Sequence, residues 1–189
     1  MAAGNWTERY KDHIVTATEA IKKIERGQRI FLGTGCGVPY HLVLELVKNA
    51  NRMSDNEIVH LFTLGNTPSA DPKFQTQFRH NTFFVSENIR EAVREGRADY
   101  TPAYLSDIPL FFNTGRIPID VALVQVSPPD EYGYCSLGIS VDVTKTGVNQ
   151  ADLVIAQVNE NMPVTHGDSY VDVRDIDYLV PYTEPLLEF

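Results

Sequence analysis

The sequence is poor in cysteine, in basic residues and in long apolar runs, and each shortage excludes a class of protein. Cys36 and Cys135 are the only cysteines, and neither has a second cysteine or a histidine at metal-binding spacing. A disulfide framework and a zinc site are therefore not indicated, and a reducing, cytoplasmic location is expected. The longest aliphatic runs, such as Val121–Val124, are far shorter than a membrane span or the core of a secretory signal.

Positive charge is also scarce. Sixteen lysines and arginines stand against 25 aspartates and glutamates, which gives a formal net charge of -9. That charge repels phosphate backbones and anionic lipid head groups, so no nucleic acid or membrane partner is expected. The five histidines show no HExxH or other paired spacing, so no metal site is expected either. With 43% apolar residues and no internal repeat, the 189 residues are expected to form one domain.

Short apolar segments alternate with amphipathic segments along the chain. Strands are predicted at residues 29–32, 57–64, 120–126 and 151–159, and helices at residues 17–26, 40–50, 87–95 and 105–112. The last two strands, "DVALVQV" and "ADLVIAQVN", do not alternate in polarity, which is typical of strands covered on both faces. The pattern predicts an α/β fold with a mostly parallel sheet and helices on both faces.

Four loops rich in glycine, proline and polar residues follow the predicted strands. They are Gly33–Pro39, Gly65–Pro72, Ser127–Gly138 and Asn159–Gly167. Ligands of open α/β sheets bind outside the carboxyl ends of the strands, which is where these loops are expected to lie. The sequence therefore predicts a binding site at that edge.

The first of these loops, in "FLGTGCGVP", is not a dinucleotide-binding loop. Val38 stands where the third glycine of G-x-G-x-x-G belongs, and no Lys-Ser/Thr pair follows, so a Walker A loop is excluded as well. The glycines are predicted to let the backbone approach a ligand; a simple tight turn is the alternative. Cys36 is interpreted as a small filler in this loop rather than as a nucleophile.

Several motifs together, in order, resemble a known family. "GxGxP" (Gly35–Pro39), "ENIREAVREGRADYTPAYLSDIP", "VSPPDEYGYCSLGIS" and "NENMPVTHGDS" are similar to the N-terminal half of the acetyl-CoA hydrolase/transferase family. The 4-hydroxybutyrate CoA-transferases are the most similar in pattern. The resemblance extends from the first helix to about residue 181, and it implies the Rossmann-like α/β fold of CoA-transferases.

The resemblance also implies an activity and a division of labour. Members of the family move coenzyme A between an acyl-CoA and a small carboxylate such as acetate, butyrate or 4-hydroxybutyrate, or hydrolyse the thioester, without a bound cofactor. A glutamate of the second half forms the covalent intermediate. The Gly-Ile-Gly-x-x-Pro stretch near that glutamate does not occur here. Residues 1–189 are therefore expected to be a single N-terminal domain without a catalytic residue, whose partners are its own C-terminal domain and a second copy in a homodimer.

The residues expected to line the substrate and CoA cleft come from three of the loops. The resemblance places short polar side chains that hold the substrate carboxylate at Asn66 and Thr67, and makes the segment after residue 126 a pocket wall. A rigid turn without ligand contact is the alternative for that wall. The expected cleft residues are Gly35, Gly37, Val38, Pro39, Asn66, Thr67, Gly133, Tyr134, Ser136 and Gly138.

Three other functions fit parts of the pattern. Sugar-phosphate isomerases have a similar sheet, but they require a cationic phosphate clamp, and these loops are short of lysine and arginine. A non-catalytic subunit that pairs with a separate glutamate-bearing chain is a second alternative. An acyl-CoA binding module is the third, and tight CoA binding by this chain alone would favour it.

Overall fold

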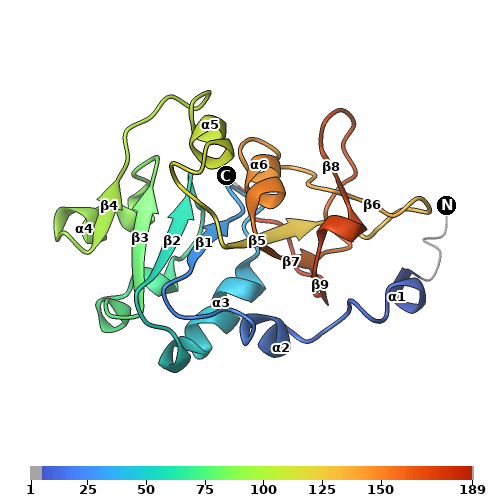
Figure 1. The fold of residues 1–189 in the computed structure, drawn as a ribbon, viewed down its shortest axis with the longest axis horizontal. Helices are drawn as coiled ribbons and strands as arrows, with labels where there is room; N and C mark the ends of the chain where they lie inside the picture. The colour runs from blue at the N-terminus through green and yellow to red at the C-terminus, as the bar shows by residue number, and fades with distance from the viewer. Residues whose placement is uncertain (1–5, 189) are drawn as a thin grey trace.

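The computed structural model describes residues 6–188, which are built around a parallel sheet of seven strands (Figure 1). The strands lie in the order β4-β3-β2-β1-β5-β7-β9. Their bounds are β1 Arg29–Leu32, β2 Asn56–His60, β3 Phe78–Thr82, β4 Ala98–Tyr100, β5 Val121–Val126, β7 Leu153–Val158 and β9 Tyr178–Pro181. Because β1 lies between β2 and β5, the strand order reverses there, and such a switch point is where ligands of open α/β sheets bind.

Helices cover both faces of the sheet, as predicted, with α2 and α3 below it and α5 and α6 above it in Figure 1. The helices are α1 Trp6–Arg9, α2 Ala17–Ile21, α3 Tyr40–Lys48, α4 Glu87–Arg94, α5 Ile108–Asn113 and α6 Thr144–Gln150. Short 3-10 turns are η1 Ala50–Arg52, η2 Pro68–Ala70, η3 Pro72–Phe74 and η4 Val173–Asp175, and β6 Tyr134–Ser136 pairs antiparallel with β8 Tyr170–Asp172. Within residues 6–188, every helix is too short or too polar to cross a bilayer.

The core is divided by the sheet into two layers, and β1 contributes to both. Ile30 and Leu32 pack with the side chains of α2 and α3, while Phe31 points to the opposite face and packs with Phe112 of α5 and Val148 of α6. This alternation is what a strand covered on both faces requires. It fixes β1, and with it the Gly-rich loop that follows, in the middle of the molecule.

Local signals predicted the starts of β1, α2, α3 and α4 correctly, but several elements are shorter than predicted: the helix predicted at residues 17–26 ends at Ile21, and the strand predicted at residues 151–159 is Leu153–Val158. The Thr16 and Glu19 side chains form the reciprocal capping box that starts α2. The strand predicted at residues 57–64 ends at His60, which pairs with the last residue of β3. Beyond it the backbone turns toward the Gly-rich loop, where the Phe62 carbonyl accepts a hydrogen bond from the Gly35 N–H at 2.7 Å. The apolar composition of residues 61–64 therefore serves a different purpose, described below.

Candidate functional site

The Gly-rich loop, residues 33–39, lies at the switch point and is held from two sides. The Gly33 N–H donates to the Leu123 carbonyl of β5 at 2.8 Å, and the Gly35 N–H donates to the Phe62 carbonyl after β2. Val38 and Pro39 are buried where the loop enters α3. The loop thus connects β1 with β5 and with the segment after β2, at the edge of the sheet where a binding site is predicted.

Two glycines of this loop are required by a neighbouring segment, Gly138–Ser140. A Cβ on Gly37 would lie 2.7 Å from the Ser140 Cβ, and one on Gly35 would lie 3.0 Å from the Ser140 Oγ. Gly35 also has φ +55°, in the left-handed region that favours glycine. Gly138, at φ +59°, is itself packed tightly against Met162. Close contact of two loops, rather than a turn alone, therefore explains the glycines.

The contact between these loops predicts the effect of a methyl group at residue 37. Gly37→Ala should lower the free energy of unfolding by about 1–3 kcal/mol, because the buried methyl overlaps Ser140. Adding Ser140→Gly removes the overlap, so the double variant should be more stable than Gly37→Ala. Urea unfolding measures both. Gly27→Ala is the control: a Cβ there meets nothing within 4 Å and φ is +76°, so any loss reflects backbone strain that Ser140→Gly should not relieve. If Ser140→Gly changed the stability of both variants equally, that would contradict the overlap.

The loop after β2 is organised by Asn88, in the first turn of α4. Its Nδ2 lies 3.0 Å from the Gly65 carbonyl oxygen, 3.1 Å from the Thr63 carbonyl oxygen and 2.7 Å from the Thr67 Oγ1. A hydroxyl that accepts from an amide keeps its own hydrogen to donate, so Thr67 is presented as a donor. Asn66 beside it is exposed. The sequence analysis assigned no role to Asn88, because its partners are remote in the chain.

The segment after residue 126, predicted as a pocket wall, does not lie in one place in the structure. Gly138 lies at the Gly-rich loop, but Gly133 and Tyr134 lie at the two-stranded β6–β8 sheet, where Gly133 abuts the Tyr10 hydroxyl and the Tyr134 ring packs against Tyr170. Tyr134 is exposed there. These two residues are not brought together with the Gly-rich loop.

Ser136, predicted to line the cleft, has an internal role. It is fully buried, and its Oγ accepts from the N–H groups of Gly138 at 3.1 Å and Thr165 at 3.2 Å. Its backbone N–H donates to the Ser127 Oγ at 2.9 Å. Ser136 therefore fixes the approach of Gly138 to the Gly-rich loop from behind, rather than contacting a ligand directly.

A buried set of amides connects the remaining loops to the Gly-rich loop. Gln125 donates to the Val38 carbonyl at 3.0 Å, and Asn159 donates to the Gln125 Oε1 at 2.6 Å and to the Glu184 carbonyl at 2.9 Å. Gln157, the β7 partner of Gln125 in register, donates to the Glu184 Oε1 at 2.7 Å. A glutamine in each of two apolar strands was the sequence signal for this network, which stabilises the loops because buried amides require partners.

The C-terminal segment, residues 182–188, crosses the same edge of the sheet. The Tyr182 ring stacks on His41 at a centroid distance of 3.6 Å, and burial there lowers the pKa of His41. Leu187 then reaches Gly65, beside the Asn88-bound loop. The segment thus links β9 to the loop after β2.

An apolar groove of about 440 Å³ opens beside these loops. It lies at the carboxyl ends of β2, β3 and β4. Its lining consists of Leu61, Phe62, Phe83, Phe84, Ala103, Leu105 and Ile108. Residues 61–64, predicted as strand, provide two of these side chains instead.

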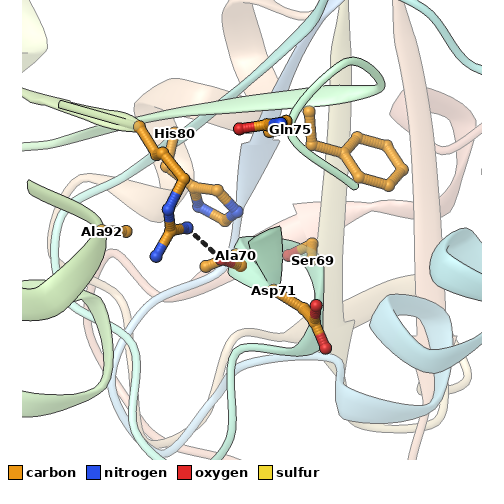
Figure 2. A pocket seen from close by; sticks show the side chains of 8 residues that line it. Ser69, Ala70, Asp71, Gln75, His80 and Ala92 are labelled. Carbon is orange, nitrogen blue, oxygen red and sulfur yellow. Dashed lines mark hydrogen bonds between the residues drawn. The ribbon is translucent and has the colours of Figure 1, made fainter. Parts of the chain in front are cut away.

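A second cavity, of about 10 Å³, lies among Ser69, His80 and Arg97 and has room for about one water molecule (Figure 2). His80 there contacts His60 of the neighbouring strand, with the Nδ1 of His80 3.4 Å from the Nε2 of His60. Burial lowers the pKa of His60 to about 3 and that of His80 to about 4. The pair is neutral at pH 7, and the cavity is too small to hold a substrate.

Neither a reactive cysteine nor a metal-binding cluster is indicated by the arrangement of residues 6–188. Cys135 is buried, which raises the pKa of its thiol to about 12 and leaves it unreactive. Cys36 is half-buried in the Gly-rich loop. Within the same residues, no group of three or more His, Cys, Asp or Glu side chains is placed to hold a metal ion.

The family model of the acetyl-CoA hydrolase/transferase N-terminal domain matches residues 2–188. The chain belongs to this family. The family resemblance inferred from the sequence motifs is therefore confirmed, and the parallel sheet at whose edge the loops meet is the fold of its structural neighbours.

Members of the acetyl-CoA hydrolase/transferase family similar to this chain are CoA-transferases. The chain is 49% identical over 183 residues to the 4-hydroxybutyrate coenzyme A transferase of Clostridium kluyveri, covering 97% of this chain and 43% of that protein. It is 36% identical over 167 residues to the succinyl-CoA:acetate/propanoyl-CoA:succinate CoA transferase of Fasciola hepatica, covering 87% and 34%. The crystal structure of the 4-hydroxybutyrate CoA-transferase of Porphyromonas gingivalis matches with a TM-score of 0.82 at 25% identity, covering 98% and 43%. The chain spans less than half the length of each.

Proposed function

We propose that the chain is the N-terminal half of an acyl-CoA:carboxylate CoA-transferase of the 4-hydroxybutyrate and acetate type. The observation that carries the proposal is the 49% identity, over 97% of the chain, to a 4-hydroxybutyrate coenzyme A transferase. The geometry supports it, since the Gly-rich loop, Gly138 and the Asn88-bound loop meet at the switch point. Hydrolysis, with water as the acceptor, is the same chemistry with a different second substrate.

In the proposed reaction, a glutamate carboxylate of the second half attacks the thioester carbonyl. The CoA thiolate leaves, and a mixed anhydride forms. The thiolate then attacks the glutamyl carbonyl, which releases the first carboxylate and leaves a glutamyl-CoA thioester. The acceptor carboxylate reverses these steps. Each step passes through an oxyanion, which fixed hydrogen-bond donors stabilise.

The role proposed for this chain is to bind and position, with no catalytic residue of its own. Thr67 is proposed to donate to a substrate carboxylate oxygen, and the hydrogen bond that its hydroxyl accepts from Asn88 supports this role, because it leaves the hydroxyl hydrogen free to donate. The bare backbone of Gly35 and Gly37 permits close approach of the acyl group. The net charge of -9 makes this half a poor site for the CoA phosphates, so the second half is proposed to supply most CoA contacts.

The test is an assay of CoA transfer from butyryl-CoA to acetate, in which the acetyl-CoA formed is measured. The chain alone should show no transfer. When the chain is joined to the C-terminal half of the Clostridium kluyveri relative, the fusion should transfer CoA. After incubation with acyl-CoA, hydroxylamine should inactivate this fusion, because hydroxylamine cleaves a glutamyl thioester. Transfer by the chain alone would contradict the division between halves. Activity only with a separately encoded glutamate-bearing chain would make it a non-catalytic subunit instead.

The proposal includes a cytoplasmic homodimer. Two free cysteines are consistent with a reducing compartment. Exposed large apolar side chains, including Tyr104 at 80% and Tyr132 at 75% exposure, are consistent with further protein contacts.

A further inference from the structure

The apolar groove begins where the Gly-rich loop is anchored. Phe62 accepts the Gly35 N–H with its backbone carbonyl and lines the groove with its ring, which packs edge-to-face against Phe84 at 5.4 Å. Thr63, the next residue, is bridged to Gly35 and held through its carbonyl by Asn88. One short segment therefore has the candidate carboxylate site on one side and the groove on the other.

The chemistry of the groove is uniform. Its seven lining side chains are all aliphatic or aromatic, from Leu61 to Ile108, and none carries a charge or a hydrogen-bonding group. Its volume of about 440 Å³ lies within the range of small-molecule pockets. A hydrocarbon group gains free energy by leaving water for such a surface, whereas a second carboxylate would lose its hydration without a partner.

We propose that this groove binds the hydrocarbon tail of the carboxylate substrate, so that the enzyme prefers monocarboxylates of about four to six carbons over acetate and over dicarboxylates such as succinate. The proposal rests on the proposed function, because it takes the Thr67 loop as the site of the carboxylate. Phe62 and Leu105 are then specificity-determining residues: the tail lies between them while its carboxylate faces the Thr63–Thr67 loop.

The chain provides a matched pair of positions to test this. Leu105 lines the groove, Leu110 lies on α5 outside the lining, and both side chains are 57% exposed. Aspartate at either position is expected to leave the fold intact, since neither side chain is in the core. Only Leu105→Asp places a charge in the groove.

The experiment measures the dissociation constants of acetate, butyrate, hexanoate and succinate for the purified 189-residue chain by NMR chemical-shift titration, without CoA. Affinity should rise about fourfold for each added methylene, so hexanoate should bind roughly fifteenfold tighter than butyrate. Succinate should bind more weakly than butyrate. Leu105→Asp should abolish the dependence on chain length, and Leu110→Asp should preserve it.

Affinities that do not depend on chain length would overturn the proposal and leave the groove as a surface for another protein segment. Equal binding of succinate and butyrate, no binding of hexanoate, or equal effects of the two aspartates would overturn it as well. The binding measurement does not involve CoA, so its outcome is independent of the CoA-transfer assay. A failure of CoA transfer would refute only the proposed function.

Discussion

Replacing Phe31 with alanine should lower the free energy of unfolding by about 3–5 kcal/mol, as expected for removal of a fully buried aromatic ring. Phe31 has no exposed surface, and its ring packs edge-to-face against Phe112 at 5.7 Å. It lies on β1, with strands on both sides, so the surrounding sheet has little freedom to close the cavity. Urea unfolding followed by circular dichroism measures the loss.

The Phe31 ring also explains why α6 has a glycine in its middle, and this contact predicts the effect of a second substitution. A Cβ on Gly147 would lie 2.6 Å from the Phe31 ring. Gly147→Ala should therefore destabilise the wild type by about 1–3 kcal/mol, although alanine favours helices by about 1 kcal/mol. In the Phe31→Ala background the methyl fills part of the cavity, so the same substitution should stabilise. A loss of equal size in both backgrounds would show that the contact is not responsible.

Acidification from pH 7.5 to pH 5 should destabilise the protein by about 2 kcal/mol for each of the two buried histidines, His60 and His80. Burial holds the pKa of His60 at about 3 and that of His80 at about 4, below the ordinary value of 6.5. As the pH falls below 6.5, the two histidines bind protons in the unfolded chain but stay neutral in the folded protein. Stability is therefore unaffected above pH 6.5 and is lost progressively toward pH 4 and then 3.

The measurement is the slope of unfolding free energy against pH, for the wild type and for a His60→Leu, His80→Leu double variant. The double variant should lose most of the slope between pH 6.5 and 5, whatever its stability at pH 7.5. His166→Leu, which removes an exposed histidine, is the comparison for the loss of an imidazole as such. A wild-type slope retained in the double variant would assign acid sensitivity to other groups.

The fold was predictable because its signals are local. Non-alternating strands such as residues 120–126, the capping box at Thr16 and the glycine-rich loops each follow from a few neighbouring residues, and parallel topology follows from their alternation. The position of the candidate site at the carboxyl ends of the strands came from the same reasoning. The structure places Gly35, Gly37 and Gly138 together there, through their contacts with Ser140 and Met162.

What escaped prediction depends on contacts between remote residues. In the sequence, Asn88 is one of several polar residues on a charged helix. Its role depends on a hydrogen bond to Thr67, 21 positions earlier, which the sequence does not show. Gly133 and Tyr134 lie away from the Gly-rich loop because β6 pairs with β8, a strand too short to show in the sequence. The groove is assembled from three separate segments, so its apolar residues resemble ordinary core residues in the sequence.

The position of β1 between β2 and β5 also constrains how the chain is made. Residues 56–60 supply one neighbour of β1 soon after it leaves the ribosome, but the other, residues 121–126, follows much later. At roughly 5–20 residues per second, several seconds of synthesis separate the two. During that interval one edge of β1 has no partner, and an unpaired strand edge is a template for strands of other chains. Nascent chains that stall before residue 121 are therefore expected to aggregate more readily than the finished chain.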